Sequence, residues 1–326
     1  MLCLLEKKLT VLEEQSTQKL NWIISALTEK DSRSKTRTLD DRRSQDSEET
    51  VAASPDGSGE KDCLYHVNSR ILQYPDSKIT RYPVPDEFVP WEVEFPGYNP
   101  LLYHAERIDR GEYDPKTEME QKSRQYNVID GLYDFRSCCG IYTVKDGLPL
   151  NPMGRTGLKG IGNMRWFGPN HSLHPVLTRW STGSASGLNQ TASKNILEVL
   201  VVRWRGNELW SLPGGTLDPG QRIPIRFKAL LVHTDLSEFL ALLDSGTEVF
   251  HGYLDDPRNT DNAWIETLAV NIHLDTKENL DKLLQNLKES DDDITLRWQL
   301  LEQKIPLYAN EKEILQRTAE HLHAHY

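Results

Sequence analysis

The sequence of 326 residues has little cysteine and no long hydrophobic run. Its four cysteines are too few and too unevenly spaced for a disulfide framework, and they lack the paired spacing of a zinc site. We therefore expect reduced thiols and no metal site. The longest apolar stretches, such as residues 196–202, fall far short of the roughly 20 residues that a membrane-spanning helix needs, so we expect no membrane span in this chain.

Positive charge is scarce relative to negative charge, with 38 Lys and Arg against 49 Asp and Glu and a formal net charge of -11 at pH 7. Nucleic-acid binding depends on clustered Lys and Arg that release counterions from the phosphates, so this balance argues against a nucleic-acid partner. It remains compatible with a small anionic ligand wherever a few arginines converge.

The first two segments of the chain differ sharply in composition. Residues 1–27 carry apolar side chains at alternating spacings of three and four, which predicts a coiled-coil helix that associates with copies of itself. The alternative is a single amphipathic helix packed on the domain that follows. Residues 28–62 contain almost nothing apolar and are expected to form a disordered linker.

The rest of the chain is expected to form two subdomains, at residues 63–190 and 191–326. Residues 65–184 are rich in Pro, Gly, Tyr and Trp, which favours short strands and structured loops over long helices. Beyond residue 190, strands alternate with helices, which indicates an α+β fold with a mixed sheet covered on both faces. Strands are expected near 196–204, 249–254, 264–273 and 294–301, and helices near 224–243, 277–290 and 310–323.

Residues 212–221 read LPGGTLDPGQ and precede an expected helix, so they resemble the start of a Nudix box, G-x5-E-x7-R-E-U-x-E-E-x-G-U. In that motif the glycines let the backbone approach a pyrophosphate, and carboxylates on one helical face hold Mg2+ against the phosphates. With Gly215 as the first glycine, the remaining box positions fall on Gln221, Ala229, Leu230, His233, Thr234 and Leu236. All the metal-side carboxylates are absent, so we expect no catalytic residue and no metal.

A longer resemblance surrounds this motif. Residues 252–267 (GYLDDPRNTDNAWIET), with 89–95, 150–158 and 167–171, are similar to the mitochondrial ADP-ribose pyrophosphatase family of the Nudix superfamily, and the similarity runs from about residue 65 to 326. The coiled coil, the linker and the degenerate box together resemble the tail of ADP-ribose-gated, melastatin-type transient receptor potential channels. The resemblance implies a Nudix-type α/β/α sandwich with a smaller N-terminal cap, and ADP-ribose as ligand with no cofactor required.

Several residues are candidates for contact with that ligand. Asp256 and Arg258 suit ribose hydroxyls and phosphate, although a capped polar turn is the alternative. The loop at residues 167–174 offers neutral donors and acceptors, with a purely structural loop as the alternative. Trp264 is expected in the core, and Glu266 as a remnant of the family's catalytic loop. The full candidate set is His171, Ser172, His174, Gly214, Gly215, Thr216, Asp256, Arg258, Leu307 and Tyr308. The last two are expected to wall the base pocket, with burial in the core as the alternative.

The leading functional hypothesis is a catalytically inactive ADP-ribose-sensing domain of a calcium-permeable cation channel. Its partners would be ADP-ribose, the rest of the channel polypeptide and neighbouring subunits of a homotetramer, at the cytoplasmic face of the plasma membrane. The rival is an active Mg2+-dependent ADP-ribose pyrophosphatase that produces AMP and ribose 5-phosphate. A second alternative is a purely structural assembly domain.

Overall fold

The computed structural model describes residues 66–106, 124–181, 196–232, 236–276, 292–302, 305–309 and 311–326, together with Leu283 and Leu287. The chain divides into two units, Met1–Lys61 and Asp62–Tyr326, and every described residue belongs to the second. The coiled coil predicted at 1–27, the linker at 28–62 and nearly all of the helix at 277–290 lie outside the described residues, so they stay predictions.

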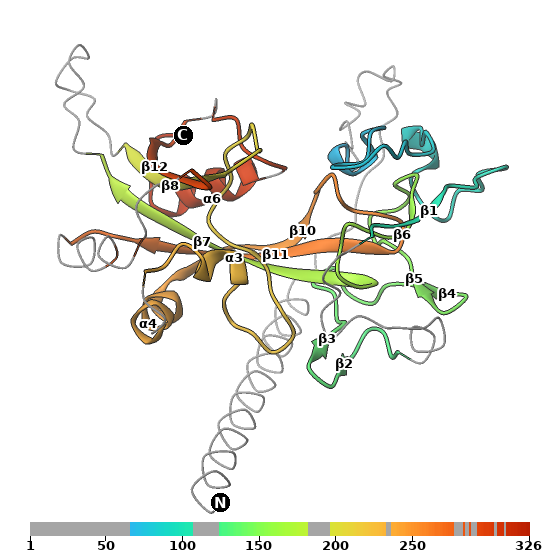
Figure 1. Cartoon of the computed structure of the whole chain (residues 1–326), viewed down its shortest axis with the longest axis horizontal. Helices are drawn as coiled ribbons and strands as arrows, with labels where there is room; N and C mark the ends of the chain where they lie inside the picture. The colour runs from blue at the N-terminus through green and yellow to red at the C-terminus, as the bar shows by residue number, and fades with distance from the viewer. Residues whose placement is uncertain are drawn as a thin grey trace, which may run out of the picture. The chain divides into compact units, whose positions relative to one another are not determined.

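A six-stranded mixed sheet organises the second unit, in the order β10-β11-β7-β8-β12 with β9 alongside β7 (Figure 1). Its strands are β7 (Gly168–Trp180), β8 (Leu197–Trp204), β9 (Gly215–Thr216), β10 (Thr247–Leu254), β11 (Ala263–His273) and β12 (Ile294–Leu300). The pair β7–β11 is parallel and the other pairs are antiparallel. The strands predicted near 196–204, 249–254, 264–273 and 294–301 are confirmed.

Strand β7 spans thirteen residues for which the sequence predicts loops and short strands. It pairs with β11 from Gly168 to Thr178, with β9 only at residues 172 and 173, and with β8 only at residues 178–180. Pro169 and Pro175 fall where β7 is paired on one edge alone, which is where a strand tolerates a missing N–H. Because β7 comes from residues 63–190, that part of the chain contributes a strand to the central sheet.

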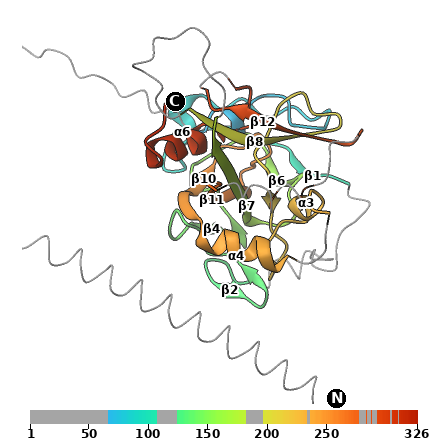
Figure 2. The same cartoon turned by 90° about the vertical axis from the view of Figure 1, so that its left-hand side faces the viewer.

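The helices lie on both faces of this sheet. They are α3 (Ile225–Lys228), α4 (Ser237–Ser245) and α6 (Glu311–His321). Alternate residues of β8 separate the two faces: Leu200 and Val202 pack in one apolar cluster with α3 and α4, whereas Val199 and Val201 pack in another with α6. Figure 2 shows α4 and α6 on opposite sides of the strands. The α/β/α sandwich is thereby confirmed. No described helix has the length and apolar character that crossing a membrane requires.

The single helix predicted at 224–243 is wrong, because the described residues form two separate helices there. After Lys228 the backbone tightens into i→i+3 hydrogen bonds, from Leu230 N to Phe227 O and from Leu231 N to Lys228 O. Leu231 then forms a β-bridge with Leu287, which draws the chain away from the helix axis. The helix predicted at 310–323 is confirmed as α6.

The first part of the unit is built of short elements, as its proline and glycine content predicts. Three two-stranded sheets join β1 (Leu102–His104) to β6 (Lys159–Gly162), β2 (Ile129–Asp130) to β3 (Tyr133–Asp134), and β4 (Val144–Lys145) to β5 (Leu148–Pro149). Two single turns of 3-10 helix, η1 (Asn68–Arg70) and η2 (Asp86–Phe88), precede them. These elements form the loop-rich region coloured blue to green in Figure 1.

Candidate functional site

The glycine turn of the degenerate box lies directly against β7. Its Gly215 and Thr216 form β9, opposite Leu173 and Ser172 of β7. Gly214 has a φ of 134°, and a Cβ atom there would lie 2.2 Å from the Leu173 carbonyl oxygen and 3.0 Å from His174 Nδ1. Only glycine permits this approach. The structure thus brings the candidate residues 214–216 together with those of 171–174.

The three candidates on β7 differ in what their side chains contact. His171 Nε2 lies 3.0 Å from the Asp134 carbonyl oxygen, and Ser172 Oγ lies 2.5 Å from Thr267 Oγ1 and donates to the Glu266 carbonyl. Both side chains therefore hold β7 to its neighbours. His174 is buried, and its Nδ1 has no hydrogen-bond partner within the described part of the chain. Burial, together with the nearby charge of Arg258, lowers the pKa of His174 to about 4, which keeps the ring neutral at physiological pH.

Asp256 and Arg258 form a bidentate ion pair in the turn between β10 and β11. Arg258 Nε and Nη2 each lie 2.8 Å from an Asp256 carboxylate oxygen, and the Arg258 backbone N–H donates to the same carboxylate at 2.8 Å. The Asp256 side chain is fully buried, whereas that of Arg258 is 32% exposed. A guanidinium has five N–H donors, so Arg258 keeps donors beyond the two that it gives to Asp256. The capped turn and a ligand contact are therefore compatible.

Tyr308 joins this pair, but Leu307 does not. The Tyr308 hydroxyl lies 3.5 Å from Asp256 Oδ1, and the Arg258 guanidinium lies 5.8 Å from the centre of the Tyr308 ring. The Tyr308 backbone N–H donates to the Trp210 carbonyl at 2.9 Å, which fixes the ring beside the ion pair. Leu307 is buried in the apolar cluster beneath α6. This burial favours the alternative of a core position, and a place for Leu307 in the wall of a base pocket stays a prediction.

Two residues near these candidates were missed from the sequence. Arg226 of α3 lies beside the glycine turn, since a Cβ on Gly215 would be 3.7 Å from its Cδ. Burial and the positive charge of Arg258 lower the pKa of Arg226, so the two guanidinium groups act on each other. Glu311 of α6 is buried and accepts the Leu212 backbone N–H at 2.7 Å, which ties the turn to α6. The only sequence signal for Arg226 and Glu311 is that each lies near the start of a predicted helix.

The described positions of the box carry no carboxylate. Gln221 is exposed and accepts a hydrogen bond from Lys228 Nζ at 3.0 Å. Leu230 is fully buried in the core beneath α3 and α4. His233 and Thr234, where the motif has its paired glutamates, lie outside the described residues. The arrangement around Gly214, Arg226, Arg258 and Tyr308 therefore supplies cations, backbone amides and a phenol ring, which together suit an anionic ligand.

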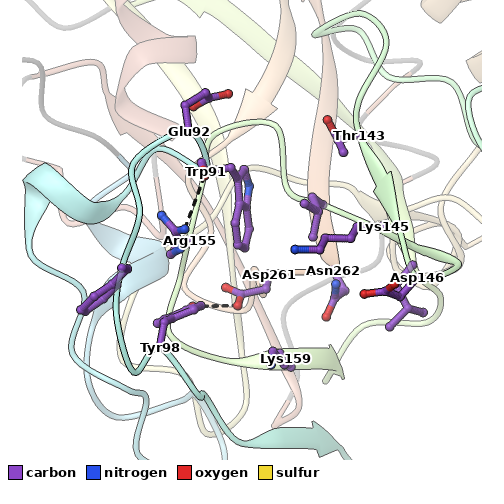
Figure 3. A pocket seen from close by; sticks show the side chains of 13 residues that line it. Trp91, Glu92, Tyr98, Thr143, Lys145, Asp146, Arg155, Lys159, Asp261 and Asn262 are labelled. Atoms are coloured by element: carbon purple, nitrogen blue, oxygen red, sulfur yellow. Dashed lines mark hydrogen bonds between the residues drawn. The ribbon is translucent and has the colours of Figure 1, made fainter.

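A cavity of about 660 Å³ lies between the loops of the first half and the turn that joins β10 to β11 (Figure 3). None of the ten candidate ligand residues lines it. Arg155 on its wall donates to the Phe88, Pro90 and Val93 carbonyl oxygens, and the Tyr98 hydroxyl donates to Asp261 at 2.7 Å. These side chains brace the loops. The candidate ADP-ribose site and this cavity are separate sets of residues.

Several known proteins and one protein family are similar to this chain. Residues 84–168 match the family described as NUDT9-like, N-terminal domain. The chain is 43% identical, over 98% of its length, to transient receptor potential cation channel subfamily M member 2 of Rattus norvegicus, and it spans 22% of that channel. It is 35% identical to the mitochondrial ADP-ribose pyrophosphatase of the same species. The aligned region covers 80% of this chain and 79% of the enzyme. A Nudix domain of Shewanella oneidensis NrtR, solved with ADP ribose, covers 48% of this chain and 90% of that one at 16% identity and a TM-score of 0.29.

Proposed function

This chain belongs to the family of the mitochondrial ADP-ribose pyrophosphatase, within the Nudix proteins, and from this membership we propose that it binds ADP-ribose without hydrolysing it. The observation that carries the proposal is the convergence of the Gly214 turn, His174 and the Asp256–Arg258 pair. These groups come from three distant parts of the chain. Together they place backbone amides near the Arg258 guanidinium, which has N–H donors beyond the two that it gives to Asp256.

Each part of the site has a role in this proposal. The pyrophosphate lies against the backbone of residues 214–216, where Arg226 and Arg258 supply the positive charge. The terminal ribose lies against the exposed part of the Arg258 guanidinium, which the buried Asp256 carboxylate orients. The neutral His174 gives a donor or acceptor without adding charge, because its pKa is far below neutral.

The absence of hydrolysis is proposed from the box positions. A catalytic Mg2+ ion needs several oxygen ligands on one helical face, and Gln221 and Leu230 supply no carboxylate there. Helix α3 is also only four residues long, so the described part of this segment offers no extended helical face. The 35% identity to an ADP-ribose pyrophosphatase keeps the active enzyme as the alternative.

The regulatory role is proposed from the 43% identity to a channel that this chain matches along 98% of its own length. In that role the domain faces the cytoplasm, and ADP-ribose binding favours one of two conformations that the neighbouring parts of a homotetrameric channel distinguish. A ligand shifts such an equilibrium only by its difference in affinity for the two states.

A calorimetric titration of the whole chain with ADP-ribose and Mg2+, followed by analysis of the mixture for AMP, tests the proposal. Heat of binding without AMP is the expected result. AMP that accumulates faster than in a control with Mg2+ alone would establish the enzyme instead. A flat titration at high protein concentration would leave only the structural role.

A further inference from the structure

Two adjacent cysteines and a buried glutamate meet beside the central sheet. Residues 137–140 form a tight reversal, in which Gly140 N donates to the Ser137 carbonyl at 3.2 Å and Gly140 has a φ of 97°. Cys138 and Cys139 occupy the tip of this reversal, and both are exposed. Glu266 reaches them from β11. The two sulfur atoms and a carboxylate oxygen of Glu266 all lie within 4.8 Å of one another.

The carboxylate of Glu266 is held by groups that fix its position. Ser137 Oγ donates to Oε1 at 2.5 Å, Trp264 Nε1 donates to Oε1 at 2.7 Å, and Cys138 N donates to Oε2 at 2.8 Å. Glu266 is only 1% exposed, so its charge is buried while the neighbouring thiols face solvent. A buried carboxylate needs compensation by hydrogen bonds or by a cation. A cation that enters from the thiol side would meet three ligand atoms at once.

The ligand types select the class of cation. Two thiolates and one carboxylate suit Zn2+, whose bonds to sulfur are about 2.3 Å and to carboxylate oxygen about 2.0 to 2.2 Å. In a tetrahedral site with such bonds the ligand atoms lie about 3.5 Å apart. The three ligand atoms lie within 4.8 Å of one another, so a Zn2+ ion would require the two exposed cysteine side chains to rotate and bring the atoms closer. Mg2+ and Ca2+ prefer oxygen ligands throughout and are disfavoured here.

We propose that Cys138, Cys139 and Glu266 form a Zn2+ site with three protein ligands and a fourth position open to water or another ligand. This site is separate from the degenerate box and does not depend on ADP-ribose binding. The expectation of no metal site arose because adjacent cysteines lack the spacing of known zinc motifs. It also arose because Glu266 is far from them along the sequence and reaches them only through the fold.

Titration of the whole chain with Co2+ under a phosphine reductant tests the site, since Co2+ replaces Zn2+ and reports thiolate ligands by its charge-transfer absorption. We expect one equivalent of Co2+ per chain to produce thiolate bands that Zn2+ then abolishes. The double variant Cys138→Ser/Cys139→Ser should lose these bands. Glu266→Gln should weaken Co2+ binding at least tenfold, with melting measured in parallel to confirm that the domain is folded.

The matched control is Cys3→Ser/Cys63→Ser, which removes the other two cysteines of the chain and should keep the full signal. Three outcomes would overturn the proposal: no thiolate band in the unmodified chain at large Co2+ excess, an unchanged band in the Cys138/Cys139 variant, or equal affinity in a folded Glu266→Gln variant. Co2+ absorption without thiolate bands would place the ion on ligands other than these cysteines, and it would likewise contradict the site.

Discussion

Arg258 is oriented by its neighbour, since Asp256 accepts both its side-chain and its backbone N–H groups. The Arg258 side chain is therefore already ordered, and binding of a ligand phosphate does not cost the conformational entropy of ordering it. At the level of single residues the candidate site consists of such prepared groups. Burial keeps His174 neutral. Gly214 can lie close against β7 because it has no Cβ atom.

Arg258→Ala should weaken ADP-ribose binding more than tenfold, because a charge-assisted contact is worth about 1.5 to 3 kcal/mol. The domain should still fold but should be less stable, by about 3 to 5 kcal/mol, because the buried Asp256 carboxylate keeps its backbone hydrogen bond and loses its cationic partner. Calorimetry measures the change in affinity. Arg205→Ala is the control, because that side chain is 75% exposed and its ion pair among the described residues is with an exposed aspartate. Equal affinity of the Arg258 variant and the control would remove Arg258 from the site.

His174 should make the free energy of unfolding depend on pH. Its pKa is about 4 in the folded chain against 6.5 ordinarily, so the unfolded chain binds more protons between these values. Stability should therefore fall as the pH drops from 6.5 towards 4, by up to about 3 kcal/mol from this residue. Urea unfolding of His174→Gln should show a shallower dependence than the parent, with His251→Gln as an exposed control. Parallel curves for parent and His174→Gln would contradict the assignment.

At the level of elements, the glycine turn and the start of β7 form one structural device. Gly214 and Gly215 both have φ near 140°, but only Gly214 would place a Cβ within 3 Å of other atoms. The family match to the N-terminal domain ends at residue 168, where β7 begins. We propose that the cap ends there rather than at residue 190.

The two glycines give a matched test of close approach. Gly215→Ala adds only backbone strain, of about 1 to 3 kcal/mol. Gly214→Ala adds the same strain and also forces the turn away from the Leu173 carbonyl. We expect the Gly214 variant to be clearly less stable in thermal melting and to lose ADP-ribose affinity. Equal behaviour of the two variants would show that contact with β7 is unimportant.

Leu230→Glu addresses the lost catalytic helix. Leu230 is fully buried, so a glutamate there should lower the free energy of unfolding by about 3 kcal/mol or more. Gln221→Glu, at the exposed neighbouring box position, should change it by no more than about 0.5 kcal/mol. Denaturant titration compares them. If both variants were as stable as the parent, reinstating the box by substitution at Gln221, Ala229, Leu230, His233 and Thr234 would be feasible, and AMP release with Mg2+ would then be the expected gain.

At the level of the whole molecule, residues 1–27 are predicted to assemble the chain into tetramers, since closed symmetry is the usual outcome for identical coils. Because the coil is short, assembly should depend on concentration. Sedimentation of the whole chain should show tetramers at hundreds of micromolar, and a chain that begins at residue 28 should remain monomeric. A whole chain that stays monomeric across that range would contradict the prediction.

Much of the fold could be predicted because local sequence signals are strong. A few residues are enough to predict a strand from the β-branched run of β8 and a tight turn from the adjacent glycines. The Asp256–Arg258 pair was found for the same reason, because the two residues are two positions apart. Strand β7 was missed because its prolines and polar residues look like loop, and its partner β11 lies over 80 residues later in the sequence. Arg226, Glu311 and the Cys138–Glu266 group were missed because only tertiary contacts bring them together.

The parallel pairing of β7 with β11 determines when the central sheet can form during synthesis of the chain. The centre of the sheet cannot form until Ala263–His273 has left the ribosome, and at about 5 to 20 residues per second the ribosome needs roughly 4 to 17 s to advance from the end of β7 to the start of β11. During that interval β7, which is mostly buried in the folded chain, lacks its main partner strand. The nascent chain should therefore depend on co-translational chaperones, and slower translation between residues 180 and 263 should lower its yield of soluble protein.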